Sequence, residues 1–486
     1  MQPGSASAAL QRLRSLVLVG VLATGVCLAA CAGSSPTAIV AATAPQTGLD
    51  PAQRAAPPPH VVSTGASVRA LWQRGPLARS RLAGGLVLAT AGNVHLPAPS
   101  TLDAFSALTG QPRWSASAPS SDPEILEMFA GGGVVVEELG GPNGFPAEEI
   151  IVKRDVIRDL RSGRELWSVG VPSRYGAHLE DQPIVYVDGL VVIGGAAGGL
   201  TAYKAKTGAV VWHRGRPRSC PQGAPNHYDE GLAADAAVLA VSYFCPSHQW
   251  ALVQRLLPRT GAALWEWQSP AVKRDSLPPL SVEGVAAQGD VVVLSGHADV
   301  LPSPTLHPRD LPQPQSWPSR LGPLGAPVLT VALDADRGRP RWVALGPAGE
   351  QVALGDGVAC QSVVQGVQCR DDRTGRLTRP LITTVRSFPK TPLGDGRLAI
   401  SRGVGCAVLS DSSSNISLLV FPLRGGGTVA HATVQLAAMR GVEGGSTTAV
   451  VDGAAPLAGG ATLVVLSREE VPRQPVVALR VAPRPS

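Results

Sequence analysis

The chain has 486 residues, with 42 Lys and Arg against 36 Asp and Glu, a formal charge of +6 and a sequence pI near 9.1. Apolar residues make up 44% and charged residues 16%, which excludes an acidic disordered protein. The 55 Gly and 44 Pro residues would interrupt nearly every long helix, so a mainly helical protein is also excluded. The basic residues are scattered and form no run of five or more, so we expect no nucleic-acid partner.

Residues 1–30 have the layout of a secretory leader. Arg12 and Arg14 precede an uncharged apolar stretch over 16–26, which is too short to span a bilayer. Residues 28–31, Leu-Ala-Ala-Cys, then resemble the lipobox of bacterial lipoproteins. This resemblance implies a lipoprotein signal peptide over 1–30 and acylation of Cys31, whose acyl chains would hold the mature protein on a membrane. The alternative is an ordinary secreted protein that is cleaved near Ala30 or Ala32.

Residues 31–65 are rich in Ala, Pro, Ser and Thr and contain few large apolar side chains. Such a segment cannot bury enough surface to become ordered, so we expect a disordered tether between the lipid anchor and a folded body that begins at residue 66. No later segment reaches 18 uncharged apolar residues, and we therefore expect no further membrane span.

The rest of the chain repeats a motif in which Thr-Gly, or a similar pair, is followed four residues after the Gly by Trp. Five copies are complete, and they end at Trp114, Trp167, Trp212, Trp265 and Trp342. A sixth copy at Thr374-Gly375 has lost the Trp. Each copy follows an alternating strand pattern, so each unit is expected to contain a strand, a tight turn in which Gly takes a positive φ, and a strand that carries the Trp.

A second repeated feature is a Gly followed by a run of β-branched and aliphatic residues, as in Gly132-Gly133-Val134-Val135-Val136. Short strands at even spacing, with no helical pattern between them, indicate an all-β array. One interval, between Gly261 and Gly338, is longer than the others because it contains a Pro-rich stretch over 298–327. We interpret this stretch as a loop inserted into one repeat, and contact with a partner is a hypothesis for its role.

A four-stranded unit of ~40–50 residues repeated around a ring is a β-propeller. The units resemble the eight-bladed propeller repeats named after pyrroloquinoline quinone (PQQ), whose signature is Ala-x-Asp-x-x-Thr-Gly-x-x-x-Trp. Ala202, Thr207-Gly208 and Trp212 match it, whereas Lys204 takes the place of the Asp. The resemblance covers nearly the whole chain after residue 65 and implies an all-β propeller over 66–484.

The expected number of four-stranded blades is eight, with seven as the alternative. Six blades end near Trp114, Trp167, Trp212, Trp265, Trp342 and Leu377. Weaker strand patterns over 396–421 and 447–479 predict a seventh blade and three strands of an eighth. The missing strand is expected near Trp72, where Ala70-Leu71-Trp72 repeats Ala263-Leu264-Trp265, and it would close the ring. We expect every repeat Trp to pack between neighbouring blades.

Two pairs of cysteines are predicted to form disulfides, because a signal peptide implies an oxidising compartment. Cys220 and Cys245 form the first pair, and a zinc site that also uses His227 and His248 is the alternative. Cys360 and Cys369 lie on opposite sides of a predicted hairpin and form the second pair. Cys406 is then left over, and it could instead pair with either of these two.

The PQQ resemblance raises the possibility of a quinone-dependent dehydrogenase. By the family pattern, such enzymes carry a Cys-Cys disulfide and a Glu-Asn-Asp calcium set, but this chain has no adjacent Cys pair. It also lacks a nucleophile elbow, a His-Glu-x-x-His motif and a Walker loop. Asp334-Ala335-Asp336-Arg337-Gly338 is similar to a calcium loop, but it coincides with a repeat turn and lacks the later Glu. We expect a non-enzymatic protein with no cofactor and no metal site.

These observations lead to the expectation of a lipid-anchored, non-catalytic propeller on the extracytoplasmic face of the cell membrane. It would bind or scaffold an envelope protein, and its composition resembles that of actinobacterial envelope lipoproteins. One alternative is similar to the lipoprotein subunit of the outer-membrane β-barrel assembly machine, with which the chain shares the anchor, the repeats and the expected blade count. The other alternative is a PQQ-dependent oxidoreductase.

Overall fold

The computed structural model describes residues 59–483 apart from internal gaps. These gaps are residues 65, 78–79, 92–99, 120–123, 143–149, 171–183, 195–198, 221–229, 236, 246–249, 269–279, 299–327, 347–351, 364–365, 384–397, 402, 413–414, 425–429, 436–448, 459–460 and 469–473. The predicted leader over 1–30 and Cys31 thus lie outside the described residues. So does the Pro-rich insertion predicted over 298–327, except for Ala298, which is the last residue of a strand. All strands belong to one compact unit, Thr47–Ser486. Within the described part, no helix has the length and apolar character needed to cross a membrane.

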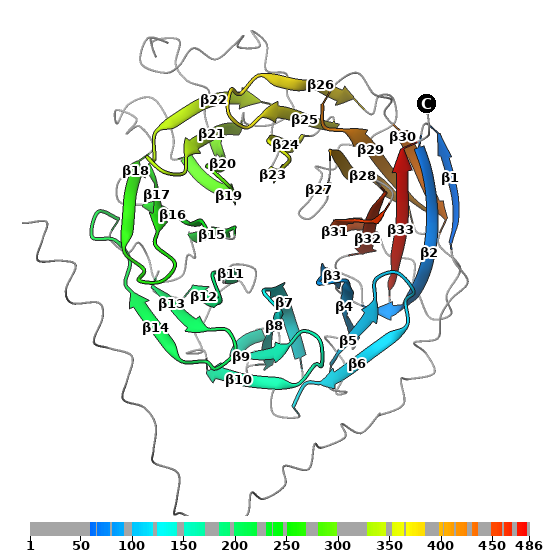
Figure 1. Ribbon diagram of the computed structural model, residues 1–486, viewed down its shortest axis with the longest axis horizontal. Coiled ribbons are helices and arrows are strands. Elements are labelled where there is room, and N and C mark those ends of the chain that lie inside the picture. Colours follow the sequence, from blue (N-terminus) through cyan, green and yellow to red (C-terminus); the bar gives the residue numbers. More distant parts are fainter. Residues whose placement is uncertain are drawn as a thin grey trace, which may run out of the picture. The chain divides into compact units, whose positions relative to one another are not determined.

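The strands form eight antiparallel sheets, seven with four strands and one with five. Figure 1 shows that the sheets follow one another around a ring, with one strand of each sheet innermost and the others successively farther out. The protein is therefore an eight-bladed β-propeller, as predicted. We call the innermost strand of each blade its first strand, and we number the blades from 1 to 8 in the order in which these innermost strands occur in the chain.

The first four blades each consist of four consecutive strands. Blade 1 contains β3 (Ser80–Ala83), β4 (Leu86–Ala91), β5 (Thr101–Ser106) and β6 (Pro112–Ser117). Blade 2 contains β7 (Glu124–Gly131), β8 (Val134–Pro142), β9 (Ile150–Asp159) and β10 (Glu165–Gly170). Blade 3 contains β11 (Ile184–Val187), β12 (Leu190–Gly194), β13 (Leu200–Lys204) and β14 (Val210–Arg214). Blade 4 contains β15 (Glu230–Ala234), β16 (Leu239–Cys245), β17 (Trp250–Leu256) and β18 (Ala263–Gln268).

The next three blades continue this pattern. Blade 5 contains β19 (Leu280–Gln288), β20 (Val291–Ala298), β21 (Val328–Asp334) and β22 (Pro340–Gly346). Blade 6 contains β23 (Val352–Gly355), β24 (Val358–Val363), β25 (Gly366–Asp371) and β26 (Leu377–Thr383). Blade 7 contains β27 (Leu398–Ser401), β28 (Val404–Ser412), β29 (Asn415–Pro422) and β30 (Ala430–Gln435).

Blade 8 joins the two ends of the chain. It contains β31 (Ala449–Pro456), β32 (Thr462–Arg468) and β33 (Gln474–Pro483), and its outermost strand is β2 (Ala66–Leu77). β2 pairs with β33 from Ala66 opposite Pro483 to Leu77 opposite Gln474. The predicted closing strand around Trp72 is therefore confirmed, and the compact unit that begins at Thr47 contains the complete ring.

An additional strand, β1 (His60–Thr64), pairs with the outer side of β30 and makes blade 7 five-stranded. The predicted disordered tether over 31–65 includes these residues, and its C-terminal boundary is wrong. Composition does not reveal this strand, because backbone pairing with an open sheet edge requires little apolar surface. Val61 adds an apolar contact with the core between blades 7 and 8.

The hydrophobic core lies in layers between neighbouring blades. One cluster joins Leu88 of blade 1 to Val135 of blade 2, and another joins Val192 of blade 3 to Val241 of blade 4. In blade 5 the second strand is covered on both faces, which explains the continuous apolar run at the start of β20. In β20, residues 291–294 are all at most 1% exposed.

Candidate functional site

The described residues define one edge of the ring most completely. Successive strands of a blade are antiparallel, so the turn from strand one to strand two and the turn from strand three to strand four lie at the same edge. We call these the inner and outer turns, and the edge that they form is the turn edge. Its outer turns in blades 1 to 6 are residues 107–111, 160–164, 205–209, 258–262, 335–339 and 372–376. The opposite edge, from which the other connections leave, is the loop edge.

The inner and outer turns of a blade are hydrogen-bonded to each other. In blade 3, Asp188 and Gly189 both have positive φ, 47° and 80°, which is the geometry of a tight two-residue hairpin turn. The carbonyl oxygen of Gly189 accepts a hydrogen bond of 3.0 Å from the backbone N–H of Ala205 in the outer turn. Equivalent bonds join Ala107 to Gly85, Leu160 to Gly133, Ala335 to Asp290, Asp372 to Gly357 and Leu423 to Gly403.

Each repeat Trp joins its blade to the outer turn of the next blade. The indole Nε1–H donates to the carbonyl oxygen of the first residue of that turn. The bonds run from Trp72 to Ala107 (2.9 Å), Trp114 to Leu160 (3.0 Å), Trp167 to Ala205 (2.8 Å), Trp212 to Pro258 (2.6 Å), Trp265 to Ala335 (2.6 Å) and Trp342 to Asp372 (2.8 Å). We call this arrangement the tryptophan contact.

The indole ring packs directly against the repeat Gly. A Cβ added to Gly163 would lie 2.6 Å from ring atoms of Trp114, and one added to Gly375 would lie 2.6 Å from Trp342. The φ angles of these glycines are +70° and +68°, so each Gly supplies both the left-handed turn and the space for the ring. The predicted packing of the Trp residues between blades is thus confirmed at six interfaces.

A second set of contacts on the turn edge was not predicted. The residue two positions before the repeat Gly reaches back to an acidic residue of the preceding blade: Lys206 to Asp159 at 3.0 Å, Arg259 to Asp188 at 2.8 Å, and Arg373 to Asp290 at 3.7 Å. In blade 5 the polarity is reversed, because Asp336 takes this position and contacts Arg255 of blade 4 at 2.7 Å. The Lys206 ammonium lowers the pKa of Asp159 to about 2. The sequence signal for these ion pairs is a basic residue two positions before the repeat Gly. Basic residues are also typical of solvated turns, so this signal does not by itself indicate an ion pair.

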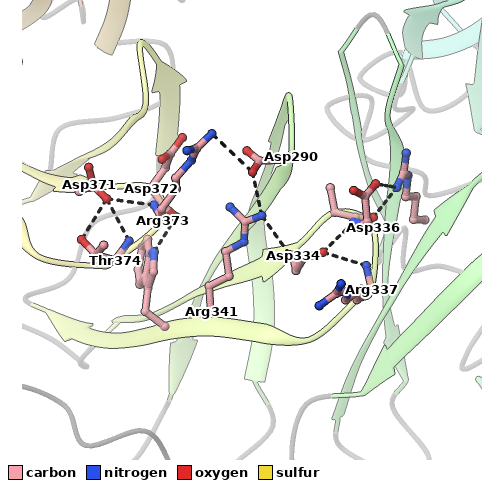
Figure 2. Close-up of polar contacts among 12 residues, drawn as sticks. Asp290, Asp334, Asp336, Arg337, Arg341, Asp371, Asp372, Arg373 and Thr374 are labelled. Carbon is pink, nitrogen blue, oxygen red and sulfur yellow. Dashed lines mark hydrogen bonds and ion pairs between the residues drawn. The ribbon is translucent and has the colours of Figure 1, made fainter.

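Figure 2 shows a group of charged side chains on this edge, at the junction of blades 5 and 6. Arg341 donates from Nη2 to Asp290 at 2.9 Å and to Asp334 at 3.0 Å. The other oxygen of Asp334 accepts the backbone N–H groups of Asp336 (3.0 Å) and Arg337 (2.9 Å). The hydrogen bond from Arg341 is the main reason that the pKa of Asp290 lies below its usual value. Residues 334–338 therefore form a turn, as predicted, and the carboxylate of Asp334 is already occupied by protein donors.

One buried acid is not explained by the repeat. Asp155 in β9 lies opposite Glu138 in β8, and it is fully buried. Neither carboxylate oxygen of Asp155 has a hydrogen-bond partner among the described residues. Burial raises the pKa of Asp155 to about 7, and the side chain lies close enough to Tyr203 of blade 3 to raise the pKa of that phenol as well, after the larger effect of burial. The sequence analysis missed this residue because an isolated Asp in a charged strand segment resembles a solvated position.

The cysteines are arranged as predicted. Cys220, after the last strand of blade 3, is bonded to Cys245 at the end of β16 in blade 4, with Cα atoms 5.1 Å apart. The thiols that a zinc site would need are thus consumed, and the candidate ligands His227 and His248 lie outside the described residues.

The second disulfide joins Cys360 to Cys369, which are directly opposed in β24 and β25. Cys406 is free and buried, and burial raises the pKa of its thiol to about 12.

The described cysteines do not fit the adjacent Cys-Cys pair that the PQQ family pattern requires. No group of three or more His, Cys, Asp or Glu residues in the described part could hold a metal ion. Cys220, Cys245, Cys360 and Cys369 are all fully buried, and the two disulfides join residues that are 25 and 9 positions apart. They do not form the adjacent Cys-Cys pair of the family pattern.

The chain is similar to several known proteins. The sequence model of a family described as "Outer membrane protein assembly factor BamB" matches residues 63–219. Among solved structures, the computationally designed Ika8 protein is 12% identical, with 84% of this chain and 95% of that chain covered and a TM-score of 0.48. BamB from Moraxella catarrhalis is 12% identical (86% and 99% covered, TM-score 0.44). A europium-containing methanol dehydrogenase is 10% identical (82% and 84% covered, TM-score 0.45). No curated protein matches the sequence.

Proposed function

We propose that this chain, a PQQ-like eight-bladed β-propeller, is a non-catalytic binding module of the bacterial cell envelope. The proposal places it on the extracytoplasmic face of the cell membrane, held by a lipid on Cys31. Its role would be to bind or scaffold an envelope protein. Folds of this kind host many functions, so the residues of this chain, and not the fold alone, must support the proposal.

The main support for the proposal is that the polar groups of the turn edge bind other groups of the protein. The turn carbonyl oxygens accept the indole N–H groups, and the aspartates contact Arg, Lys or backbone N–H groups of the same or a neighbouring blade. These groups stabilise the ring, and they are not arranged around a reacting atom. A rigid ring with connections of different length on the other edge is a common design for binding proteins. Those connections range from residues 364–365 to residues 299–327.

The envelope location is supported by the sequence and by the cysteines. The leader and the Leu-Ala-Ala-Cys segment over 28–31 are typical of exported lipoproteins. Two disulfides are typical of an oxidising compartment.

The anchor is tested by labelling cells with a fatty-acid probe. Lipidation of Cys31 predicts labelling of the wild-type chain and its recovery with membranes, whereas Cys31→Ser abolishes the label. Cys406→Ser is the control, because it removes a buried cysteine without altering the lipobox, and it must leave the label unchanged. Labelling that survives Cys31→Ser would contradict the anchor.

The binding role is tested by crosslinking in intact cells. A protein crosslinked to the wild-type chain should be lost when residues 299–327 are replaced by a short Gly-Ser connection. The matched control replaces residues 269–279, another loop-edge connection, in the same way. Retention of every crosslinked protein in the first variant would remove the proposed role of the insertion.

A role like that of the BamB family, in outer-membrane protein assembly, is the second candidate, favoured by the family match over residues 63–219. It predicts that depletion of this protein lowers the amount of folded outer-membrane β-barrel protein. A host without an outer membrane would exclude it.

The non-catalytic proposal is tested against the alternative of a PQQ-dependent oxidoreductase by adding PQQ. Purified protein is mixed with PQQ and Ca²⁺, and we expect neither a change in quinone absorbance nor reduction of an electron-accepting dye by added alcohols. Either signal would overturn the non-catalytic proposal.

A further inference from the structure

We propose that the turn edge docks on the anionic surface of a phospholipid bilayer. The partner is identified by its chemistry, a planar array of phosphate-bearing headgroups. This inference rests on the proposed envelope location, but it does not require the lipid on Cys31.

The first observation is a set of exposed basic side chains that have no ion-pair partner in the described part of the chain. All lie within four residues of a repeat Gly, and they come from blades 1, 2, 3, 5 and 6. They are Arg113, Arg161, Arg164, Lys204, Arg337, Arg339 and Arg376.

The second observation is that the acidic residues of the same edge are already occupied. Asp188 contacts Arg259, and Asp336 contacts Arg255. Asp356 accepts a neutral backbone N–H from Gly403 of the next blade and so keeps its negative charge, and Glu165 is also exposed. These two carboxylates are outnumbered by the seven exposed basic residues, so the turn edge presents a surplus of positive charge, although the whole chain carries only +6.

Two exposed leucines lie on the same edge. Leu108 is 55% exposed and Leu257 is 41% exposed. Leu108 occupies the outer-turn position that holds Arg161 in blade 2 and Lys206 in blade 3. Apolar side chains surrounded by basic ones are typical of surfaces that lie in the interfacial region of a membrane.

The arrangement favours a bilayer over a soluble polyanion. At 0.1 M salt, exposed charges interact appreciably only within about 10 Å of each other. A narrow soluble polymer would therefore contact the basic residues of only a few blades at the same time. A flat headgroup surface can meet the turns of all blades together, because they share one edge of the ring.

The test uses residues 47–486, which contain the complete ring, and measures co-sedimentation with lipid vesicles. We expect binding to vesicles of phosphatidylcholine with 30% phosphatidylglycerol, little binding to phosphatidylcholine alone, and loss of binding in 0.5 M salt. Each of Arg161→Ala, Arg339→Ala and Arg376→Ala should weaken binding about fivefold, and the triple variant about 100-fold. Leu108→Gln should weaken binding and leave its salt dependence unchanged.

Arg218→Ala is the matched control. Arg218 is also exposed and its removal causes the same change in charge, but it follows β14 and so lies toward the loop edge. It should bind as the wild type does. All variants should unfold at the wild-type temperature, because the substituted side chains are exposed and unpaired.

Equal binding to both kinds of vesicle, wild-type binding by the triple variant, or an equal loss in Arg218→Ala would overturn the inference. Binding to inorganic polyphosphate without binding to vesicles would assign the edge to a soluble polyanion and would overturn it as well. None of these results bears on the crosslinking test, which concerns the loop edge.

Discussion

At six interfaces of the ring, an indole N–H, a turn carbonyl oxygen and a Gly meet in the same way. The hydrogen bond contributes about 1 kcal/mol, and it also satisfies a carbonyl oxygen that a buried turn would otherwise leave unpaired. Burial of the ring over the turn contributes more, since an aromatic side chain removes the largest apolar area from water. The Gly is essential because any side chain at this point would occupy the place of the ring.

This reasoning predicts different effects of the same substitution at two kinds of Gly. Gly189→Ala introduces strain alone, since its φ is +80° and an added Cβ meets nothing within 4 Å. It should cost about 1–2 kcal/mol of unfolding free energy. Gly163→Ala has similar strain, with φ +70°, and also displaces Trp114, so it should cost a further ~1–3 kcal/mol. Urea unfolding measures both values, and equal costs would show that Trp114 adjusts freely.

The buried carboxyl group of Asp155 predicts a pH effect. Its pKa is raised to about 7 in the folded state, so the folded protein binds the proton more tightly than the unfolded chain does. Stability attributable to this group is therefore present at low pH and is lost as pH rises from about 4 to about 7, by up to ~4 kcal/mol.

Asp155→Asn should be more stable than the wild type at pH 8 and lose this advantage at pH 4.5. Asp336→Asn, whose side chain is 75% exposed, is the control. An equal pH profile for Asp155→Asn and the wild type in urea unfolding would contradict the burial of this carboxyl group.

At the scale of elements, two interfaces lack the tryptophan contact among the described residues: blade 6 with blade 7, and blade 7 with blade 8. The second of these is crossed by the chain itself, because β1 pairs with blade 7 and β2 pairs with blade 8. Only residue 65 separates the two strands. The N-terminal segment thus replaces, by a covalent connection, a contact that other interfaces obtain from a side chain.

Truncation separates the roles of these two strands. A chain that begins at residue 66 lacks β1 and should remain folded, with a loss of a few kcal/mol, since β1 pairs with one strand only. A chain that begins at residue 80 also lacks β2 and Trp72, so blade 8 loses its outer strand and its contact with Ala107. We expect this shorter chain to be insoluble or to lose its near-ultraviolet circular dichroism. Native behaviour of the shorter chain would show that the ring closes without β2.

Most of the fold follows from the sequence because the repeat encodes a turn and an interface together. A Gly with a Trp four residues later specifies a left-handed turn and an aromatic side chain next to the following blade, and both are local chemistry. β1 escaped the sequence analysis because pairing through the backbone leaves little trace in composition. The ion pairs of Lys206 and Arg259 were missed because a charged turn residue looks the same whether or not a partner lies in the next blade. Asp155 was missed because burial of a strand residue depends on the neighbouring blade.

At the scale of the whole molecule, Cys406 reports on the integrity of the ring. It is fully buried in the cluster that joins blades 7 and 8, together with Val464 and Leu479. In residues 47–486, the native protein should not react with a thiol reagent, because burial raises the pKa of Cys406 to about 12. One thiol should react after unfolding, and five after reduction of both disulfides.

The same reagent tests the role of β1. If this strand holds blades 7 and 8 together, the chain that begins at residue 66 should label at Cys406 faster than the chain that begins at residue 47. Equal labelling rates would show that the interface opens independently of β1.

The pairing of β2 with β33 also has a consequence for biosynthesis. β2 is among the first strands to leave the ribosome, and its partner is the last strand to be made. Until β33 has been made, β2 therefore has no strand partner, although Trp72 can already pack against Ala107 of blade 1. The nascent protein would be most vulnerable to aggregation at this strand, and a chaperone that binds unpaired strands would find its binding site there, at the opposite end of the polypeptide from the segment that finally covers it.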